Sequence, residues 1–284
     1  MILSYHPMLA GDHWRLCAGR DPDEEDFELM ASAEAVLLPQ GRHYNLYSAA
    51  AKYWSYVFPD YYCRYAYPGK IGDIRLFQEL GLPHPQTRIF SSVACCPENF
   101  WHGLSYPVIL KNNYGGEGRL VSLVQGQDQV WGVLDMYVKM EKSGFSGFLV
   151  QEFIPTSSRT LRVVVMGERY YSYWRVQPDT QNFLHNIQAG AQIDHESDPL
   201  LQARGVELAR ELAQRSGINL AGIDLLFPER DSEKNQIPLL LEINYYFARK
   251  GLGGSDRYYE LLQEAVDEWL GQRSLRYADA AGEN

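Results

Sequence analysis

Hydrophobic runs long enough to cross a membrane are lacking, because none approaches the roughly 20 residues that a spanning helix needs. Residues 1–14 also lack a basic segment ahead of an apolar one, so we expect no signal peptide and no membrane partner. Cysteine is scarce, and its four positions form no CxxC pair and no disulfide framework: Cys17, Cys63, Cys95 and Cys96. This usage favours a reducing, cytoplasmic setting.

Positive charge is also in short supply. The 26 lysines and arginines stand against 36 acidic residues in a chain of 284, which gives a formal net charge of −10. Nucleic-acid binding needs a basic surface, so we expect no nucleic-acid partner. Hydrophobic residues make up 45% of the chain, enough for a packed core, and at about 150 residues per domain the length predicts about two domains.

Familiar catalytic arrangements are missing as well. The sequence shows no Ser-His-Asp or Cys-His constellation, no HExxH motif and no Walker A loop, since no GK[ST] follows Gly118. The seven histidines are scattered, and we interpret His185 as a packing or substrate-contact residue rather than a general base.

Short strands and helices alternate at the start of the chain. Residues 1–5 and 35–38 are typical of buried strands, and residues 21–33 and 45–54 of helices, the first with an acidic first turn that suits the helix dipole. This order favours a small parallel sheet. Further along, the pattern predicts helices over 73–80, 129–141, 200–216 and 260–270, strands over 106–110, 120–124, 147–154, 221–227 and 238–244, a hairpin of 162–166 with 169–176, and a frayed tail from 273.

Oxygen-bearing side chains lie in two apolar strands near the C-terminus. Glu242 and Asn244 are two residues apart, so both leave the same face of their strand. Asp224 lies within the apolar run AGIDLLF, where a carboxylate is costly unless it is paired or binds a metal. Carboxylate and amide oxygens are ligands for hard cations, which predicts a Mg²⁺ site. The alternative is that these side chains lie at strand edges and face water.

Lys111 follows the apolar segment YPVIL and precedes a turn rich in glycine. Such a lysine either extends to the surface or pairs with an anion. The turn, residues 114–118, offers backbone N–H groups with little steric hindrance, which suits phosphate contacts. A plain glycine hairpin is the alternative for this turn.

Two arginines are expected to align in the hairpin. Gly167 and Glu168 suit a two-residue turn. That turn places Arg162 opposite Tyr173, and Arg175 then lies diagonal to Arg162 on the same face. Two adjacent guanidinium groups repel unless an anion lies between them, which indicates a phosphate or carboxylate clamp. A solvated sheet face is the alternative.

These motifs follow one another in an order that resembles the ATP-grasp superfamily, in particular its glutathione-synthetase-like and ribosomal-protein-modifying (RimK-type) carboxylate–amine ligases. The matching segments span roughly residues 65 to 255: KIGDIRLFQELGLPHPQT, YPVILK with GGEG, LVQEFI, RTLRVVV, HNIQAG, GIDLLF and LLLEIN. The resemblance implies α/β and α+β structure, with an ATP-grasp fold of two α+β lobes that grip ATP. The implied parts are a small Rossmann-like pre-ATP-grasp domain at 1–68, an N-lobe with a Gly-rich lid at 69–154, a C-lobe with the metal site at 155–272, and a tail at 273–284.

The resemblance also implies a role for each motif. Lys70 and Lys111 correspond to the two lysines that hold the nucleotide phosphates. The implied Mg²⁺ ligands are Asp224, Glu242 and Asn244. The other expected site residues are a lid at Gly115, Gly116, Glu117 and Gly118, an adenine-binding hinge at Gln151, Glu152, Phe153 and Ile154, and catalytic residues that face the phosphoryl group and the substrate, Arg162, Arg175 and Asn186.

The sequence departs from the family pattern at two ligand sites. Thr160 stands where an acidic residue is often found, which leaves Ser157 or the backbone to bind the ribose. Residues 245–248, YYFA, replace the glycine and proline usual after the metal-binding asparagine. We interpret Arg249 and Lys250, with the two tyrosines before them, as a substrate mouth suited to an acidic substrate. The alternative is that the tyrosines pack under the loop.

The implied activity is ATP-dependent joining of a carboxylate to an amine, or to a thiol, through an acyl phosphate with release of ADP and phosphate. The expected cofactors are ATP and Mg²⁺, as two ions for which Mn²⁺ can substitute. The expected partners are a small carboxylate or peptide and an amine acceptor, and a homo-oligomer is open. Two alternatives also stay open: a small-molecule kinase, and a non-catalytic ATP-binding module that engages a partner.

Overall fold

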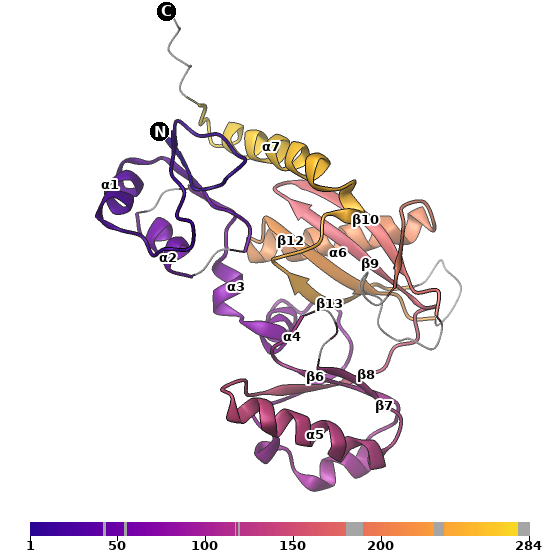
Figure 1. The fold of residues 1–284 in the computed structure, drawn as a ribbon. Helices are drawn as coiled ribbons and strands as arrows, with labels where there is room; N and C mark the ends of the chain where they lie inside the picture. Colours follow the sequence, from indigo (N-terminus) through magenta and orange to yellow (C-terminus); the bar gives the residue numbers. More distant parts are fainter. Residues whose placement is uncertain are drawn as a thin grey trace, which may run out of the picture.

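The computed structural model describes residues 1–41, 44–53, 56–116, 118, 120–179, 190–229 and 236–277. These residues form three separate sheets (Figure 1). Within the described ranges, no helix combines the length and the apolar character needed to cross a bilayer.

The first sheet is parallel throughout, as the strand-helix-strand pattern predicts, with the order β2-β1-β3-β4. Helix α1 begins at a capping box, in which the side chains of Asp23 and Asp26 each accept a hydrogen bond from the other's backbone N–H. The elements of this unit are β1 (Ile2–Ser4), β2 (His13–Trp14), α1 (Glu24–Ser32), β3 (Ala35–Leu37), α2 (Tyr44–Lys52) and β4 (Tyr56–Phe58).

The second sheet, with helix α5 on one face, forms a unit that we call the N-lobe. Its strands are antiparallel in the order β5-β8-β6-β7. Val108 and Leu110 of β6 are buried in the core shared with α5, so Lys111, which follows Leu110, leaves the opposite face. The elements are β5 (Thr87–Phe90), β6 (Val108–Asn112), β7 (Val121–Val124), α5 (Gln127–Lys142) and β8 (Phe148–Glu152).

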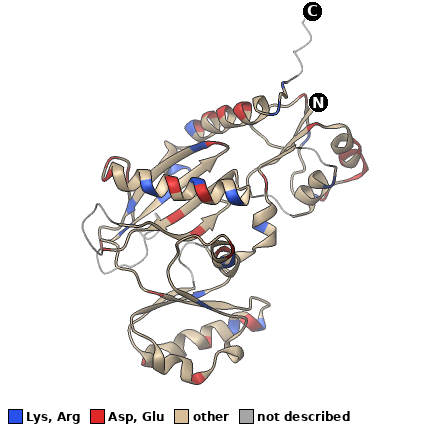
Figure 2. Ribbon diagram, turned by 180° about the vertical axis from the view of Figure 1, so that it is seen from behind, with Lys and Arg blue, Asp and Glu red and all other residues tan. Residues whose placement is uncertain are grey.

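The third sheet forms the C-lobe, with the strand order β11-β10-β9-β12-β13. Two helices cover its opposite faces: Leu161 and Ile223 share a core with α6, whereas Val164 and Leu220 share one with α7. Both signs of charge alternate along α6, while acidic residues dominate α7 (Figure 2). The elements are β9 (Arg159–Met166), β10 (Arg169–Val176), β11 (Gln192–Asp194), α6 (Pro199–Ser216), β12 (Leu220–Leu226), β13 (Leu239–Asn244) and α7 (Ser255–Gly271).

Helix α4 (Gly69–Glu79), preceded by the short α3 (Tyr62–Ala66), lies between the sheets of the two lobes (Figure 1). Its residues Ile74 and Phe77 are buried in one cluster with Leu149 of the N-lobe and Leu161 and Ile243 of the C-lobe. Burial of this apolar surface fixes α4 against both lobes. The first turn of α4 consequently lies at their junction.

The structure corrects several boundaries. Helix α4 begins at Gly69 rather than at residue 73, so Lys70 lies inside its first turn and not ahead of it. Asn113 makes this early start favourable, because its backbone and side-chain oxygens accept from Lys70 N at 3.2 Å and Ile71 N at 2.9 Å. Strand β6 continues through Lys111, and α7 starts at Ser255 rather than at 260. The pattern also misses the short elements β2, β4, α3, β5 and β11.

Candidate functional site

Strand register gathers charged side chains on the C-lobe sheet. Arg162 of β9 lies opposite Tyr173 of β10, and Arg175 follows two residues later, which confirms the expected hairpin register. Strand β12 places Asp224 opposite Arg162, and β13 places Glu242 opposite Asp224. Arg162, Asp224 and Glu242 therefore lie side by side on three neighbouring strands.

Asp224 pairs with both arginines. Its Oδ1 atom accepts from Arg162 Nε at 2.5 Å and lies 2.8 Å from Arg175 Nη2, while its Oδ2 atom accepts from Arg162 Nη2 at 3.0 Å. Burial alone would raise the pKa of Asp224, but the two guanidinium groups hold it below its ordinary value. The protein thus supplies an anion between the arginines. The alternative of a solvated face is wrong, because Arg162 is 6% exposed and Arg175 8%.

One donor of this cluster has no partner. Arg175 Nη2 also donates to Thr160 Oγ1 at 3.1 Å, but the buried Arg175 Nε has no hydrogen-bond partner among the residues that the structure describes. Burial lowers the pKa of Arg175 in spite of the neighbouring Asp224. An unpaired buried donor costs free energy, and an oxygen of a bound anion would satisfy it.

A glycine makes room for Arg162. Gly222 of β12 lies between Val164 of β9 and Asn244 of β13. A Cβ atom at Gly222 would lie 2.6 Å from Arg162 Nη1 and 3.2 Å from its Cζ. The guanidinium group therefore lies directly on the β12 backbone, an approach that only glycine permits.

Lys111 reaches the same region from the N-lobe. It is 7% exposed, so the alternative of a lysine that extends to the surface is wrong. Burial lowers the pKa of Lys111 to about 8; nearby Glu242 counteracts this shift and nearby Lys70 adds to it. Asp73 and Asp224 also raise this pKa, so charges of α4 and of the C-lobe act on this ammonium group of the N-lobe.

Lys70 links the glycine-rich turn to the C-lobe. Its Nζ atom donates to Gly115 O at 2.7 Å and to Glu242 Oε1 at 3.4 Å. Gly115 and Gly118 have φ values of 123° and 77°, which favour glycine. The structure therefore brings Lys70, Lys111 and this turn together. Of the other two expected lid residues, Gly116 is among the described residues, whereas Glu117 lies outside them.

Asp73 is a site residue that the motif analysis missed. It lies three residues after Lys70, on the same helix face, and is 6% exposed. Its Oδ2 atom accepts from the backbone N–H of Ile243 at 3.2 Å, between the two expected metal ligands of β13. Burial, followed by the nearby Glu242, raises the pKa of Asp73 well above its ordinary value. The sequence signal that could have found Asp73 is its spacing of three residues from Lys70, which places both side chains on one face of a helix.

The three expected metal ligands lie on neighbouring strands and contact other side chains. Asn244 Nδ2 donates to Asp224 Oδ2 at 3.2 Å, and Glu242 pairs with Lys70. Asp224 is buried, so the water-facing alternative is wrong for it, whereas the Glu242 side chain is 27% exposed. No group of three or more His, Cys, Asp or Glu suited to a metal ion occurs in the part of the chain that the structure describes. The set still offers two carboxylates and an amide oxygen, the donor type of a hard cation.

The expected hinge residues form the end of β8 and the segment after it. Gln151 is buried, and its Nε2 atom donates to Thr87 Oγ1 at 2.9 Å. Glu152 is exposed at the end of the strand, and Phe153 and Ile154 follow it half-buried. Gln151 alternates with Val150, which packs under α5, so Gln151 leaves the same sheet face as Lys111.

The two tyrosines that follow β13 differ in their surroundings, so each of the two interpretations fits one of them. Tyr245 packs against Tyr61 with ring centroids 6.3 Å apart, whereas Tyr246 is 74% exposed. Arg249 lies over two tyrosine rings of α7, and Lys250 is exposed. In the expected substrate mouth, Tyr246 and Lys250 are thus exposed, whereas Tyr245 and Arg249 are half-buried.

A carboxylate from a distant loop meets the segment that follows the hinge. Glu229 N donates to Pro155 O at 3.0 Å, and the Glu229 carboxylate accepts from Ser157 N. The sequence offers no carboxylate within residues 155–160, but the fold brings this one beside them. Asn186 and His185 lie outside the described residues.

Comparisons with known proteins identify the family of this chain. Residues 70–261 match the RimK-like ATP-grasp domain. The chain is 25% identical over 189 residues to a probable alpha-L-glutamate ligase of Citrobacter koseri, covering 66% of this chain and 58% of that protein. It is 28% identical to a protein of the same description from Alkalilimnicola ehrlichii, covering 53% of this chain and 45% of that protein. The chain thus spans about half the length of these curated relatives.

Solved structures give the same fold. A RimK domain ATP-grasp protein from Sphaerobacter thermophilus superposes with a TM-score of 0.63 at 17% identity, covering 94% of this chain and 98% of that one. The D-Ala:D-Ser ligase VanG from Enterococcus faecalis gives a TM-score of 0.62 at 14% identity, covering 82% and 72%. With the domain match extending over more than half of its length, the chain belongs to the RimK-like ATP-grasp family and has the ATP-grasp fold.

Proposed function

We propose that this chain catalyses the ATP-dependent ligation of a carboxylate to an amine, with release of ADP and phosphate. The observation that carries the proposal is the convergence of four poorly exposed cations, Lys70, Lys111, Arg162 and Arg175, at the junction of the lobes. Cations held away from water interact strongly with a triphosphate and a transferring phosphoryl group. Family membership and the relatives described as probable alpha-L-glutamate ligases support the same class of reaction.

For the nucleotide, we propose that Lys70 and Lys111 bind phosphate oxygens under the glycine-rich turn. Lys70 already holds Gly115 O, so a phosphate would replace a carbonyl that this ammonium group binds here. The backbone of residues 151–154 would meet the adenine edge, and Glu229 is the carboxylate best placed for the ribose hydroxyls.

For the metal, we propose that Asp224, Glu242 and Asn244 hold Mg²⁺, which would neutralise charge on the phosphates. The donor set fits a hard cation, and the half-buried Glu242 is bound only loosely, by Lys70 at 3.4 Å. Entry of a triphosphate would draw Lys70 away from Glu242. The freed carboxylate would then be available to an ion that arrives with the nucleotide.

The proposed reaction requires no covalent attachment to the protein. A carboxylate oxygen of the substrate attacks the γ-phosphorus, the bond to the β-phosphate oxygen breaks, and an acyl phosphate and ADP form. The amine nitrogen then attacks the acyl carbon, and phosphate leaves as the C–N bond forms and the nitrogen loses a proton. Arg162 and Arg175 would stabilise the charge on the transferring group, with Arg175 Nε as the free donor and Asn186 as a further contact.

For the substrates, we propose an acidic α-amino acid as one of the two reactants. The description of the curated relatives names glutamate. In this chain the exposed Lys250 and Tyr246 follow the proposed metal strand and offer a cation and an aromatic surface at its end. The four cysteines are free, which is consistent with the proposed cytoplasmic setting.

A screen with ADP release as readout tests this proposal. Purified protein with ATP and Mg²⁺ is offered small carboxylates and amines, singly and in pairs, beginning with L-glutamate. ADP release that needs both partners supports the ligase. ADP release without an amine, together with a stable phosphorylated product, would instead identify a kinase. Nucleotide binding without turnover on any pair would leave a binding module.

A further inference from the structure

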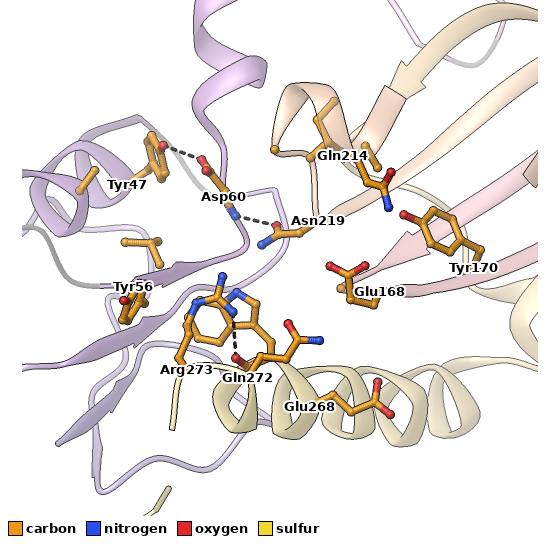
Figure 3. A pocket seen from close by; sticks show the side chains of 17 residues that line it. Tyr47, Tyr56, Asp60, Glu168, Tyr170, Gln214, Asn219, Glu268, Gln272 and Arg273 are labelled. Carbon is orange, nitrogen blue, oxygen red and sulfur yellow. Dashed lines mark hydrogen bonds between the residues drawn. The ribbon is translucent and has the colours of Figure 1, made fainter. Parts of the chain in front are cut away.

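A hollow lies at the hairpin end of β9 and β10, and none of the charged side chains of the candidate functional site lines it. It has a volume of about 590 Å³, within the size range of small-molecule sites. Its walls come from α2, β4, the turn between β9 and β10, and the ends of α6 and α7, as Figure 3 shows. Met166, next to the turn that lines the hollow, lies four residue steps along β9 from Arg162, which is about 13 Å of strand. The hollow is therefore distinct from the candidate functional site.

Two opposite charges face this hollow without pairing. Glu168, in the β9–β10 turn, is exposed at the rim, and Arg273 follows α7. Within the described ranges no ion pair joins them, although Glu168 is near enough to raise the pKa of Arg273 against the lowering effect of burial. Arg273 Nε is buried and has no hydrogen-bond partner among the described residues. Glu168 and Arg273 line the same hollow without pairing, so together they suit a ligand that carries one positive and one negative charge.

The guanidinium group of Arg273 is held firmly in place. It lies 4.4 Å from the ring centroid of Trp269 and 5.1 Å from that of Tyr56, and its Nη1 atom donates to Trp269 O at 2.9 Å. The nearby Asp60 is occupied, because it accepts from Tyr47 OH at 2.8 Å. A positioned arginine between two rings is a preformed carboxylate receptor, since little rotamer entropy is lost on binding.

Among the remaining polar groups of the hollow, Glu268 pairs with Arg169 and Asn219 Oδ1 accepts from Asp60 N, whereas others have no hydrogen-bond partner in the described chain. Figure 3 shows the Glu168 carboxylate, the Tyr170 hydroxyl and the Gln272 amide pointing into one space. Among the described residues, the side-chain amides of Gln214 and Gln272 make no hydrogen bond. Such amides both donate and accept, so they favour a polar ligand between the two charges.

We propose that this hollow binds a zwitterion of the amino-acid type, a free α-amino acid or a short peptide. Its carboxylate pairs with Arg273, its ammonium group with Glu168, and its polar side chain or peptide bond with the two glutamine amides. A simple anion would leave Glu168 as a repelling neighbour, and a simple cation would face Arg273. Only a ligand that carries both charges satisfies the two groups at once.

Isothermal titration calorimetry tests the site on the full chain. L-glutamine and the dipeptide L-alanyl-L-glutamine are titrated with a non-hydrolysable ATP analogue and Mg²⁺ present, so that the nucleotide part of the candidate functional site is occupied. We expect one saturable site for at least one probe, and the tighter probe decides between amino acid and peptide. Glu168→Gln and Arg273→Gln should each weaken binding at least about tenfold. The N-acetyl and C-amide derivatives, which each lack one charge, should lose a similar factor.

Matched controls keep the result interpretable. Glu260→Gln removes an exposed α7 carboxylate outside the hollow and should leave the affinity unchanged. Because Arg273 packs on two rings, thermal unfolding of Arg273→Gln is measured as well, and Glu168→Gln alone carries the test if that variant is unstable. The proposal is overturned if neither probe binds saturably, if Glu168→Gln binds like wild type, or if Lys111→Ala abolishes binding, since the last result would place the probe at the other site.

Discussion

At the scale of single residues, the candidate site gathers more buried positive charge than negative charge. A single carboxylate, that of Asp224, pairs with both arginines of the site, and Glu242 pairs with Lys70. Lys111 has no carboxylate within ion-pair distance among the described residues, and burial lowers its pKa to about 8. The site therefore holds more positive charge than its own carboxylates neutralise, which is the condition a polyphosphate ligand would relieve.

Lys111 gives a prediction with a defined pH dependence. If its ammonium group binds phosphate, nucleotide affinity of wild type should fall as pH rises above about 8, because the free protein then loses that proton. Lys111→Arg should keep its affinity from about pH 7 to about pH 9, and Lys111→Ala should bind roughly ten- to a hundredfold more weakly at neutral pH. Titration with a fluorescent ATP analogue measures all three. Wild-type affinity in Lys111→Ala would remove this residue from the nucleotide site.

Asp224 gives a prediction about stability. In Asp224→Asn two buried guanidinium groups lose their counter-charge, so the free energy of unfolding at neutral pH should fall by about 3–5 kcal/mol. The folded-state pKa of Asp224 is lowered, so its contribution is complete above the ordinary value of 3.8 and is lost as pH falls below it. The gap between wild type and variant in urea unfolding should consequently narrow in acid. Glu264→Gln, which breaks an exposed pair with Arg169, is the control and should change stability little.

At the scale of elements, the sequence predicts those features that depend on residues close together in the chain. The register of β9 and β10 could be predicted because a two-residue turn fixes which residues face each other, and this placed Arg162 opposite Tyr173. The parallel first sheet followed from its strand-helix-strand order. Contacts between distant elements could not be predicted in this way: Lys70 and Glu242 are 172 residues apart, and no periodicity links them.

Helix α4 shows why some site residues escaped the sequence analysis. Pro68 and Gly69 interrupt the apolar pattern, so the helix seemed to start at residue 73, and Lys70 fell outside it. Only the tertiary contact with Asn113 of the β6 end completes the first turn. Asp73 then looks like an ordinary acidic residue at a helix start, although it is buried against β13. Tertiary packing overrides local preference at both residues.

Asp73 yields a prediction for this element. Asp73→Ala leaves the buried N–H of Ile243 without its acceptor, which should cost about 1–3 kcal/mol of unfolding free energy and loosen α4 from β13. Because α4 also carries Lys70, the KM for ATP should rise. Asp73→Asn keeps an acceptor oxygen and should restore both stability and KM in large part. Equal behaviour of the two variants would contradict a role for this hydrogen bond in positioning α4.

Strand β12 yields another prediction. Gly222→Ala places a Cβ atom 2.6 Å from Arg162 Nη1, so the guanidinium group must shift from its position on the strand. We expect turnover to fall at least about tenfold while circular dichroism stays that of wild type. Gly132→Ala is the matched control, since its Cβ meets nothing within 4 Å and alanine favours the α5 helix. Full activity of Gly222→Ala would show that the placement of Arg162 does not matter for turnover.

At the scale of the whole molecule, three units bring their charged residues to one junction. The N-lobe contributes Lys111, α4 contributes Lys70 and Asp73, and the C-lobe contributes the arginines and carboxylates. The order of motifs along the chain was enough to predict the ATP-grasp fold, because each motif marks one element of that fold. The placement of Tyr245 under the loop, with Tyr246 exposed, required the structure, since it depends on packing against Tyr61.

The central claim is that a substrate carboxylate attacks ATP at this junction, and oxygen transfer tests it most directly. A carboxylate substrate labelled with ¹⁸O in both oxygens is turned over with ATP and the amine, and the released phosphate is analysed by mass spectrometry. The account predicts one ¹⁸O atom in each phosphate for wild type, and no turnover for Glu242→Ala with its fold intact. Phosphate that contains no ¹⁸O, formed together with ADP and the ligated product, would contradict it.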